Sequence, residues 1–255
     1  MDLHNYLVQI LEQKKITNET KSKLNSAFDN ILQDLSEVRQ YNPEIFKAGS
    51  SGRNIMIQSD SIDLDIAIYF SKSMNNTVEE LYEYVFSLLK QKGYKPSIVY
   101  NGVAMEVKER TTGLDVDIVV GKYINATYVN LHNYSGFKQR SSLNVQKDYV
   151  KGLQAIIRIF KIWRESQDLS AWHKLAMEQT IVRALQGRED YWNNYGYCFE
   201  IVLKDIPNSI LNAKFFDPTN PNNEIIVNEQ VRRTVRDTAN NCIRFLQSQN
   251  YKALF

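Results

Sequence analysis

The sequence is poor in the residues that build metal centres and disulfide frameworks. Its 255 residues include two cysteines, Cys198 and Cys242, and three scattered histidines, His4, His132 and His173. Neither set has the spacing of a zinc site, and the two cysteines fit no disulfide framework. We interpret the cysteines as buried, reduced thiols of a reducing compartment, and the histidines argue against a histidine-metal centre.

The sequence also lacks a long apolar run and a strong net charge. No segment approaches the roughly 18 apolar residues of a membrane helix, and "MDLHNYLVQILEQKK" at the N-terminus has no apolar core or cleavage site of a signal peptide. We therefore expect a soluble, cytoplasmic protein with no membrane partner. The formal net charge is +2, which does not indicate a strongly basic surface for a long nucleic acid, although a local basic patch is compatible with it.

Apolar residues make up 43% of the chain, enough for a full core, and their period changes along it. Up to about residue 41 they recur every three or four positions, which predicts helices, and from Ile62 they alternate, which predicts a strand. A helix that begins at the capping pair Thr77 and Glu80 follows, then a hairpin around Asn101-Gly102 and a strand in "GLDVDIVVG". The helical period then returns for the rest of the chain.

These periods predict an α+β fold in two parts. We expect residues 1–130 to hold N-terminal helices and a small mixed sheet, and residues 131–255 to form a helical lobe. No linker rich in Gly or Ser separates the parts, so we expect them to pack closely with a cleft between them.

Two pairs of aspartates lie inside the predicted strands. Residues i and i+2 of a strand point to the same side, so Asp63 and Asp65 share a face opposite the isoleucines, and Asp115 and Asp117 share one in the later strand. One such pair alone is typical of a solvated strand edge, but carboxylates gathered on one face repel one another unless a cation lies among them. Hard oxygen ligands favour Mg²⁺ or Mn²⁺, and carboxylates that bridge two ions about 4 Å apart suit in-line phosphoryl transfer.

A turn of small residues, Gly49-Ser50-Ser51-Gly52, precedes the first aspartate pair. Small residues let backbone amides approach phosphate oxygens, and a serine hydroxyl can donate to one as well. The plain alternative is an ordinary surface loop. The turn is not a Walker A loop, because Gly-Lys-Thr/Ser is missing.

Three motifs in series resemble one superfamily. "AGSSGRNIMIQSDSIDLDI" resembles the nucleotidyltransferase signature of polymerase-beta-like enzymes, and "FFDPTNPNNEI" resembles an element of the oligoadenylate synthetases and the cGAS/DncV-like nucleotidyltransferases (CD-NTases). "IIRIFKIWRE" is similar to the helix in those families that carries a Lys followed by Trp. The matches run from about Ala48 to Asn223. They imply a polymerase-beta-like nucleotidyltransferase core with a C-terminal helical lobe that completes the nucleotide pocket, and an active site in the cleft between.

The resemblance assigns roles to acidic residues by position. Asp63 and Asp65 match the metal-binding pair, and Asp117 matches the third carboxylate, which in the family helps to activate the attacking ribose hydroxyl. The role of Asp115 stays open. All three matched aspartates are therefore candidate catalytic and metal-binding residues, for two Mg²⁺ or Mn²⁺ ions.

The resemblance also assigns nucleotide-binding residues. Gly49 and Ser50 match the turn that holds the triphosphate, and Lys161 stands where related enzymes place a lysine on it; its plain alternative is a solvated helix lysine. The Ser-Tyr of the next helix in other members has no clean counterpart in "LSAWHKLAMEQTI", which offers Ser170, His173 and Lys174. From this segment we take Lys174 as the candidate nucleotide-binding residue.

The implied activity is metal-dependent, template-independent nucleotidyl transfer with release of pyrophosphate. The substrates would be nucleoside triphosphates such as ATP. Because the chain is compact and has no zinc finger or large RNA-binding domain, a small nucleotide acceptor is favoured over a long polymer. The expected product is a cyclic or short linear oligonucleotide second messenger for a separate effector, by analogy in bacterial anti-phage (CBASS-like) antiviral defense.

Three other functions are compatible with parts of the pattern. An RNA-tailing or tRNA-modifying nucleotidyltransferase would share the catalytic residues but should show a basic RNA track. An antibiotic- or protein-modifying transferase would need a different acceptor pocket. A catalytically inactive nucleotide-binding module is disfavoured because all the acidic positions are present. Base choice, linkage, ring closure, an activating ligand and oligomeric state stay open.

Overall fold

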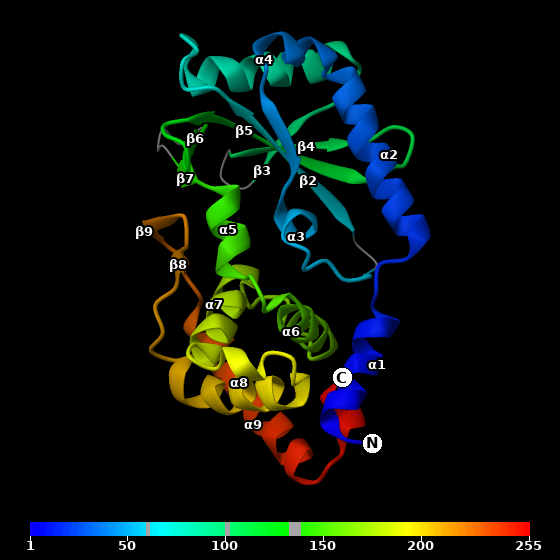
Figure 1. The fold of residues 1–255 in the computed structure, drawn as a ribbon, viewed down its shortest axis with the longest axis vertical. Coiled ribbons are helices and arrows are strands. Elements are labelled where there is room, and N and C mark those ends of the chain that lie inside the picture. The colour runs from blue at the N-terminus through cyan, green and yellow to red at the C-terminus, as the bar shows by residue number, and fades with distance from the viewer. Residues whose placement is uncertain (60–61, 100–102, 133–138) are drawn as a thin grey trace. The chain divides into compact units, whose positions relative to one another are not determined.

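The computed structural model describes residues 1–59, 62–99, 103–132 and 139–255. The chain folds into two compact units, one of residues 16–147 and one of residues 1–15 together with residues 148–255. We call them the sheet unit and the helical unit and describe each by itself (Figure 1). Among the described residues, no helix is both long enough and apolar enough to cross a membrane.

The sheet unit is built on one mixed sheet. Its strands are ordered β1-β2-β5-β4-β3, with β6 paired to β5 and β7 to β6; β2 and β5 run parallel, and the other pairs are antiparallel. Its elements are α2 (Asn18–Asp34), η1 (Ser36–Tyr41), β1 (Glu44–Lys47), α3 (Gly49–Gly52), β2 (Asp63–Phe70), α4 (Val78–Gln91), β3 (Ser97–Val99), β4 (Ala104–Lys108), β5 (Asp115–Tyr123), β6 (Val129–Leu131), β7 (Gln139–Ser141) and the start of α5 (Leu143–Tyr149).

One face of this sheet carries the main core. Because strand side chains alternate, the apolar residues of β2 and β5 point to the side on which α2 and α4 pack. Leu64, Ile66 and Ile68 of β2 are fully buried there, and Val116 and Ile118 of β5 lie beside them. A smaller cluster on the opposite face includes Ala67, Tyr69, Val129, Leu131 and Leu143. The predicted alternation from Ile62 onward is therefore confirmed.

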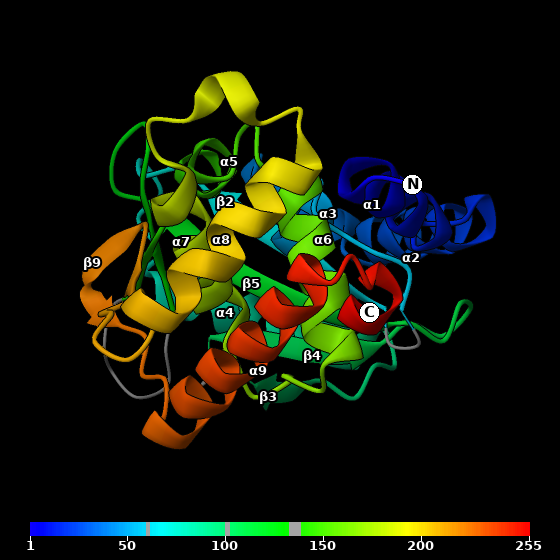
Figure 2. The ribbon, with the colours of Figure 1, turned by 90° about the horizontal axis from the view of Figure 1, so that it is seen from below.

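The helical unit consists of helices and one short hairpin. Figure 2 shows α8 and α9 side by side, and α1 packs against α6 and α8. Its elements are α1 (Leu3–Gln13), α6 (Gln154–Ser166), α7 (Lys174–Leu185), η3 (Glu189–Tyr191), α8 (Tyr195–Ser209), β8 (Phe216–Asp217), β9 (Asn220–Glu224), α9 (Glu229–Gln247) and η4 (Tyr251–Leu254).

The β8–β9 hairpin carries most of the motif "FFDPTNPNNEI" and is held by α7. The Gln179 amide pairs with the Phe216 backbone on both sides: its Nε2 donates to the carbonyl, and its Oε1 accepts from the amide at 3.2 Å. Arg183 donates to the Lys214 carbonyl at 2.7 Å, and its guanidinium lies 5.4 Å from the ring centre of Phe215. Two polar side chains one helical turn apart thus fix the start of the hairpin.

Local predictions can be compared directly with these elements. The capping box is confirmed, since Thr77 accepts from the Glu80 amide at 3.1 Å and Glu80 accepts from the Thr77 amide at 2.8 Å. Strands β3 and β4 pair as a hairpin, as predicted, while Asn101 and Gly102 lie outside the described residues. Both thiols are reduced and buried, and burial raises the pKa of Cys198 to about 11.

The units differ from the expected division in two places. We predicted parts of residues 1–130 and 131–255, whereas α1 groups with the C-terminal helices and residues 131–147 group with the sheet. The amphipathic period of α1 shows that it buries one face but does not show against which helices. The predicted domain roles stay predictions.

Candidate active site

The four strand aspartates lie on one face of the sheet. Strands β2 and β5 are parallel neighbours, and their register pairs Asp63 with Asp115 and Asp65 with Asp117. Residues paired across two strands project to the same side, so the two Asp-x-Asp segments face the same way. The register therefore brings together carboxylates that lie about fifty positions apart in the sequence.

Their surroundings differ from one aspartate to the next. Asp117 is 5% exposed, whereas Asp115 is exposed, and its carboxylate lies 3.9 Å from the Lys108 ammonium. Glu106 of β4 is opposite Asp117 in the antiparallel register. Solvent screens the ion pair between Asp115 and Lys108, because both side chains are exposed. The buried carboxylate of Asp117 has less water around it, so its charge acts more strongly on a neighbouring group.

The glycine-serine turn packs directly against one of these carboxylates. The Ala48 amide donates to the Asp65 carbonyl at 2.8 Å, and Gly49, the next residue, has a φ of +51°. A β-carbon on Gly49 would lie 1.8 Å from Asp65 Oδ2. Only glycine fits this position, because the backbone is left-handed and the carboxylate occupies the space of a side chain.

The rest of the turn is equally constrained. It forms the single helical turn α3, in which the Ile55 amide donates to the Ser50 carbonyl at 3.0 Å and Arg53 Nε donates to the Gly49 carbonyl at 3.1 Å. A β-carbon on Gly52 would lie 2.3 Å from the Lys47 carbonyl oxygen. The segment is thus a rigid turn beside Asp65 and not a loosely held surface loop.

A hollow of about 530 Å³ opens beside the aspartates. Three of the aspartates line it, together with residues from α2, β4 and the segments that precede β2 and β5. Its lining is Thr20, Lys23, Gln58, Ser59, Ile62, Asp63, Glu106, Gly113, Leu114, Asp115 and Asp117. Thr20 and Lys23 of α2 and Glu106 of β4 belong to no motif in the sequence, and Gln58 lies inside the motif that begins with the glycine-serine turn but has no role assigned to it there.

The aspartates match a divalent cation in their donor type but are not arranged as a complete ligand set. Carboxylate oxygens on two adjacent strands are hard ligands of the kind that Mg²⁺ and Mn²⁺ prefer. Across the part of the chain that the structure describes, however, there is no group of three or more His, Cys, Asp or Glu side chains placed to hold a metal ion. The strand register places the aspartates on one face, as a metal site requires, but the described side chains do not converge as a group of three ligands.

The two candidate lysines belong to the helical unit. Lys161 lies on α6 and is half-buried, and Lys174 is the exposed first residue of α7. His173 caps α7 by accepting from the Leu175 amide at 3.2 Å, and burial and the nearby Arg164 lower its pKa. That either lysine meets the strand aspartates stays a prediction.

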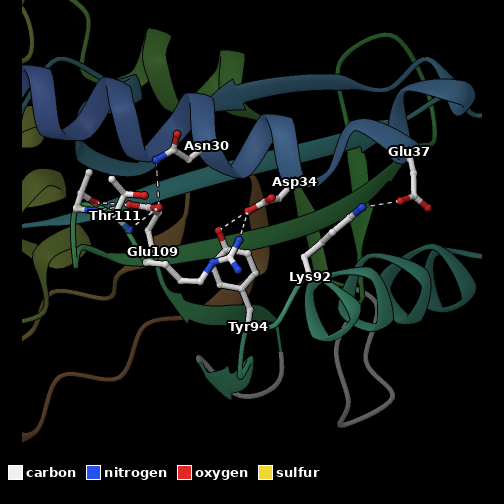
Figure 3. Close-up of polar contacts among 9 residues, drawn as sticks. Asn30, Asp34, Glu37, Lys92, Tyr94, Glu109 and Thr111 are labelled. Atoms are coloured by element: carbon white, nitrogen blue, oxygen red, sulfur yellow. Dashed lines mark hydrogen bonds and ion pairs between the residues drawn. The ribbon is translucent and has the colours of Figure 1, made fainter.

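A buried glutamate fixes the turn that leads into β5. Figure 3 shows Glu109 beneath α2, where Asn30 Nδ2 donates to it at 3.2 Å. The Thr111 and Thr112 amides donate to the same carboxylate at 3.0 and 2.7 Å, and the Thr112 hydroxyl donates at 2.6 Å. Burial opposes the charge of Glu109, but these hydrogen bonds outweigh it and lower its pKa to about 2. The turn is thus locked just before Gly113 and Leu114.

A second polar group joins α2 to the segment after α4. Figure 3 shows Asp34 beside the Tyr94 hydroxyl, from which it accepts a hydrogen bond. This distance is 2.7 Å, and Asp34 also accepts from Arg110 at 3.0 Å. Lys92 donates to Glu37 at 2.8 Å nearby. Burial and the bond to Asp34 raise the pKa of Tyr94 to about 12. These contacts hold α2, whose first turns line the hollow, against the sheet.

Comparisons with known proteins identify the fold. No protein-family model matches the sequence, and no curated protein sequence matches it. Solved structures do match. Escherichia coli MS115-1 CdnC, in a complex with HORMA-deltaN, aligns with a TM-score of 0.75 at 16% identity, over 97% of this chain and 91% of that chain.

Two further structures show how widely this fold is shared. Elizabethkingia meningoseptica CdnE, a cyclic dinucleotide synthase solved with GTP and Apcpp, gives a TM-score of 0.69 at 13% identity over 96% of this chain and 99% of its own. The Cid1 poly(U) polymerase, as an H336N mutant bound to MgATP, gives a TM-score of 0.70 at 10% identity, over 99% of this chain and 98% of that chain. The chain has the fold of the polymerase-beta-like nucleotidyltransferases, as the sequence predicted.

Proposed function

We propose that the chain is a metal-dependent, template-independent nucleotidyltransferase. It joins nucleoside triphosphates and releases pyrophosphate. The observation that carries the proposal is the packing of Gly49 against the Asp65 carboxylate, with Asp117 opposite on the neighbouring strand. A rigid turn of small residues beside paired carboxylates suits a triphosphate and its counter-ions. Fold neighbours that act on nucleotides support the proposal.

Three aspartates carry the chemistry in this proposal. Asp63, Asp65 and Asp117 would hold two Mg²⁺ or Mn²⁺ ions, which when bound neutralise charge on the transferring phosphate and on pyrophosphate. Asp117 would accept the proton of the attacking ribose hydroxyl, because a buried carboxylate beside the nucleophile is a suitable general base. The role of Asp115, which is exposed and near Lys108, stays open.

The nucleotide-binding residues follow from the turn and from the resemblance. Gly49 offers a backbone without a side chain beside Asp65, and Ser50 adds a hydroxyl that can donate to a phosphate oxygen. We assign Lys161 to the triphosphate by its position in the family motif, and Lys174 as a further candidate on the next helix, where the family's Ser-Tyr has no clean counterpart.

The product that we favour is a cyclic or short linear oligonucleotide. The CdnE neighbour is a cyclic dinucleotide synthase, and this chain covers nearly all of it. Such a product would act through a separate effector in the cytoplasm, in defence against phage. RNA tailing is the second candidate, because the poly(U) polymerase Cid1 has the same fold.

Product analysis tests the proposal. Purified protein is incubated with labelled triphosphates, singly and together, with Mg²⁺ or Mn²⁺, and the products are resolved after phosphatase treatment. We expect small phosphatase-resistant species and no product from Asp63→Asn. A ladder that extends an added RNA would favour tailing, and no incorporation by the wild type under any combination would contradict nucleotidyl transfer.

A further inference from the structure

Another hollow lies within the helical unit, where the chain leaves α8 and where α9 begins. Its volume is about 340 Å³, and its lining is Leu211, Asn212, Glu229, Arg233 and Arg236. We call it the arginine hollow. It shares no residue with the candidate active site, and its residues lie outside the three motifs from which the function is proposed.

The wall of the arginine hollow that follows α8 is fixed by Arg232. The Arg232 Nη1 donates to the Ile210 carbonyl at 2.7 Å and to the Ala213 carbonyl at 2.6 Å. Carbonyl groups at the end of a helix have no partner within the helix and carry partial negative charge, which the guanidinium compensates. Leu211 and Asn212, which lie between these two carbonyls in the chain, are therefore held in place, and the end of α8 does not repel an anion.

The two arginines of the lining lie three positions apart on α9, so they are neighbours on one face of the helix. Arg233 donates to Glu229 at 2.5 Å, and Arg236 Nε donates to Asp237 at 2.8 Å. In the described part of the chain each guanidinium meets one carboxylate, and since a guanidinium has five N–H groups, both have some left for a ligand. Their planar arrangement matches a carboxylate.

We propose that the arginine hollow binds an acidic peptide segment of a partner protein. A carboxylate side chain of the segment lies on Arg233 and Arg236, and an adjacent aliphatic side chain lies against Leu211, which is 36% exposed. Arg232 Nε also donates to the Val227 carbonyl at 2.9 Å, so the preceding residue, Ile226, belongs to the same corner of the unit; it is 77% exposed. Contact with the segment would remove this apolar surface from water.

The charge and size of the arginine hollow favour a peptide carboxylate over a polyanion. Two guanidinium groups and one carboxylate line it, which leaves one positive charge in excess. A nucleic acid or a polyphosphate would bring several negative charges toward Glu229 and toward Asp237 beside it. The volume of about 340 Å³ is at the lower end of the range of small-molecule sites and suits one or two side chains.

NMR titration of the full chain tests the proposal. The probes are the peptide Ac-Gly-Glu-Leu-Glu-Gly-NH₂, the matched peptide Ac-Gly-Gln-Leu-Gln-Gly-NH₂, and inorganic phosphate. We expect the acidic peptide to shift the backbone amide signals of Leu211 and Asn212 and the Nε–Hε signals of Arg233 and Arg236. The glutamine peptide should bind at least about tenfold more weakly, because it has no charge for the guanidinium groups.

Variants connect the binding to the lining residues. Arg233→Gln combined with Arg236→Gln should weaken the acidic peptide at least about tenfold, and Leu211→Asn should weaken it without a change of charge. Arg244→Gln, at an exposed arginine of α9 outside the lining, is the matched control and should leave binding unchanged. Because the ion pairs of both arginines lie at the surface, the double variant should unfold at the same temperature as the wild type.

Three results would overturn the proposal. One is the absence of any shift at the four lining residues with the acidic peptide, and another is equal binding of the glutamine peptide. The third is tighter binding of inorganic phosphate than of the acidic peptide at the same residues, which would make the arginine hollow a phosphate site. Failure to form product from triphosphates would instead count against the proposed function alone.

Discussion

At the scale of single residues, the sequence was most informative where chemistry and spacing coincide. Asp63 and Asp65 stand out because charge is rare inside a strand, and their shared face follows from the period of two. Glu106 could not be found in this way. The residues around it in the sequence form no motif, and it reaches the hollow only because the strand register pairs it with Asp117.

Replacement of Asp65 by asparagine should separate activity from stability. We expect product formation to fall at least about a thousandfold, because the substitution removes a carboxylate that the proposed function assigns to the metal ions. The free energy of unfolding should stay the same or rise, because one of several carboxylates on a crowded face has been neutralised. Product yield and urea unfolding check the two effects, with Asp29→Asn on the exposed side of α2 as the control. Full turnover by the Asp65 variant would show that the metal pair is assigned wrongly.

Gly49 should be far less tolerant of alanine than an unconstrained glycine. Gly187 has a φ of +74°, and a β-carbon added to it would have no neighbouring atom within 4 Å, so Gly187→Ala should cost only the left-handed strain of about 1–2 kcal/mol. Gly49→Ala adds a clash with the Asp65 carboxylate and should cost more in urea unfolding, with loss of product. Equal stability losses in the two variants would contradict the close approach of the turn to Asp65.

At the scale of elements, long periodic segments were predictable and short ones were not. β2, β5, α4 and α6 have enough residues for a period to appear. β6, β7 and the β8–β9 hairpin have only two to five residues each, and side-chain contacts from other elements determine where they lie. The hairpin depends on Gln179 and Arg183 of α7, which no local pattern connects to it.

The turn between β4 and β5 should make stability depend on pH through Glu109. Its folded pKa is about 2, below the ordinary value of 4.5. The ionised carboxylate therefore stabilises the fold above about pH 4.5, and this stabilisation is lost as the pH falls toward 2. Glu109→Gln should lower the free energy of unfolding at pH 7 and flatten its decline between pH 5 and pH 2. Glu12→Gln, in an exposed pair with Lys15, is the control and should change neither.

At the scale of the whole molecule, the fold class followed from the order of the periods, but the grouping of the elements did not. Helices at both ends of a central sheet predict an α+β chain. They do not show that α1 groups with α6 and α8, because an amphipathic helix has the same pattern whichever apolar surface it covers. That grouping depends on the match between surfaces that lie far apart in the chain.

Net charge gives a prediction that separates the two candidate products. The 31 basic and 29 acidic residues nearly cancel, so the net charge of the chain does not favour binding of a long RNA. We expect only weak binding of a labelled single-stranded RNA in low salt, none at about 150 mM salt, and product formation from triphosphates that does not change when RNA is added. A shallow slope of log affinity against log salt would agree with few phosphate contacts. Tight RNA binding at that higher salt concentration, together with RNA extension, would instead make the chain a tailing enzyme, because a polymer acceptor must be held by its backbone charge.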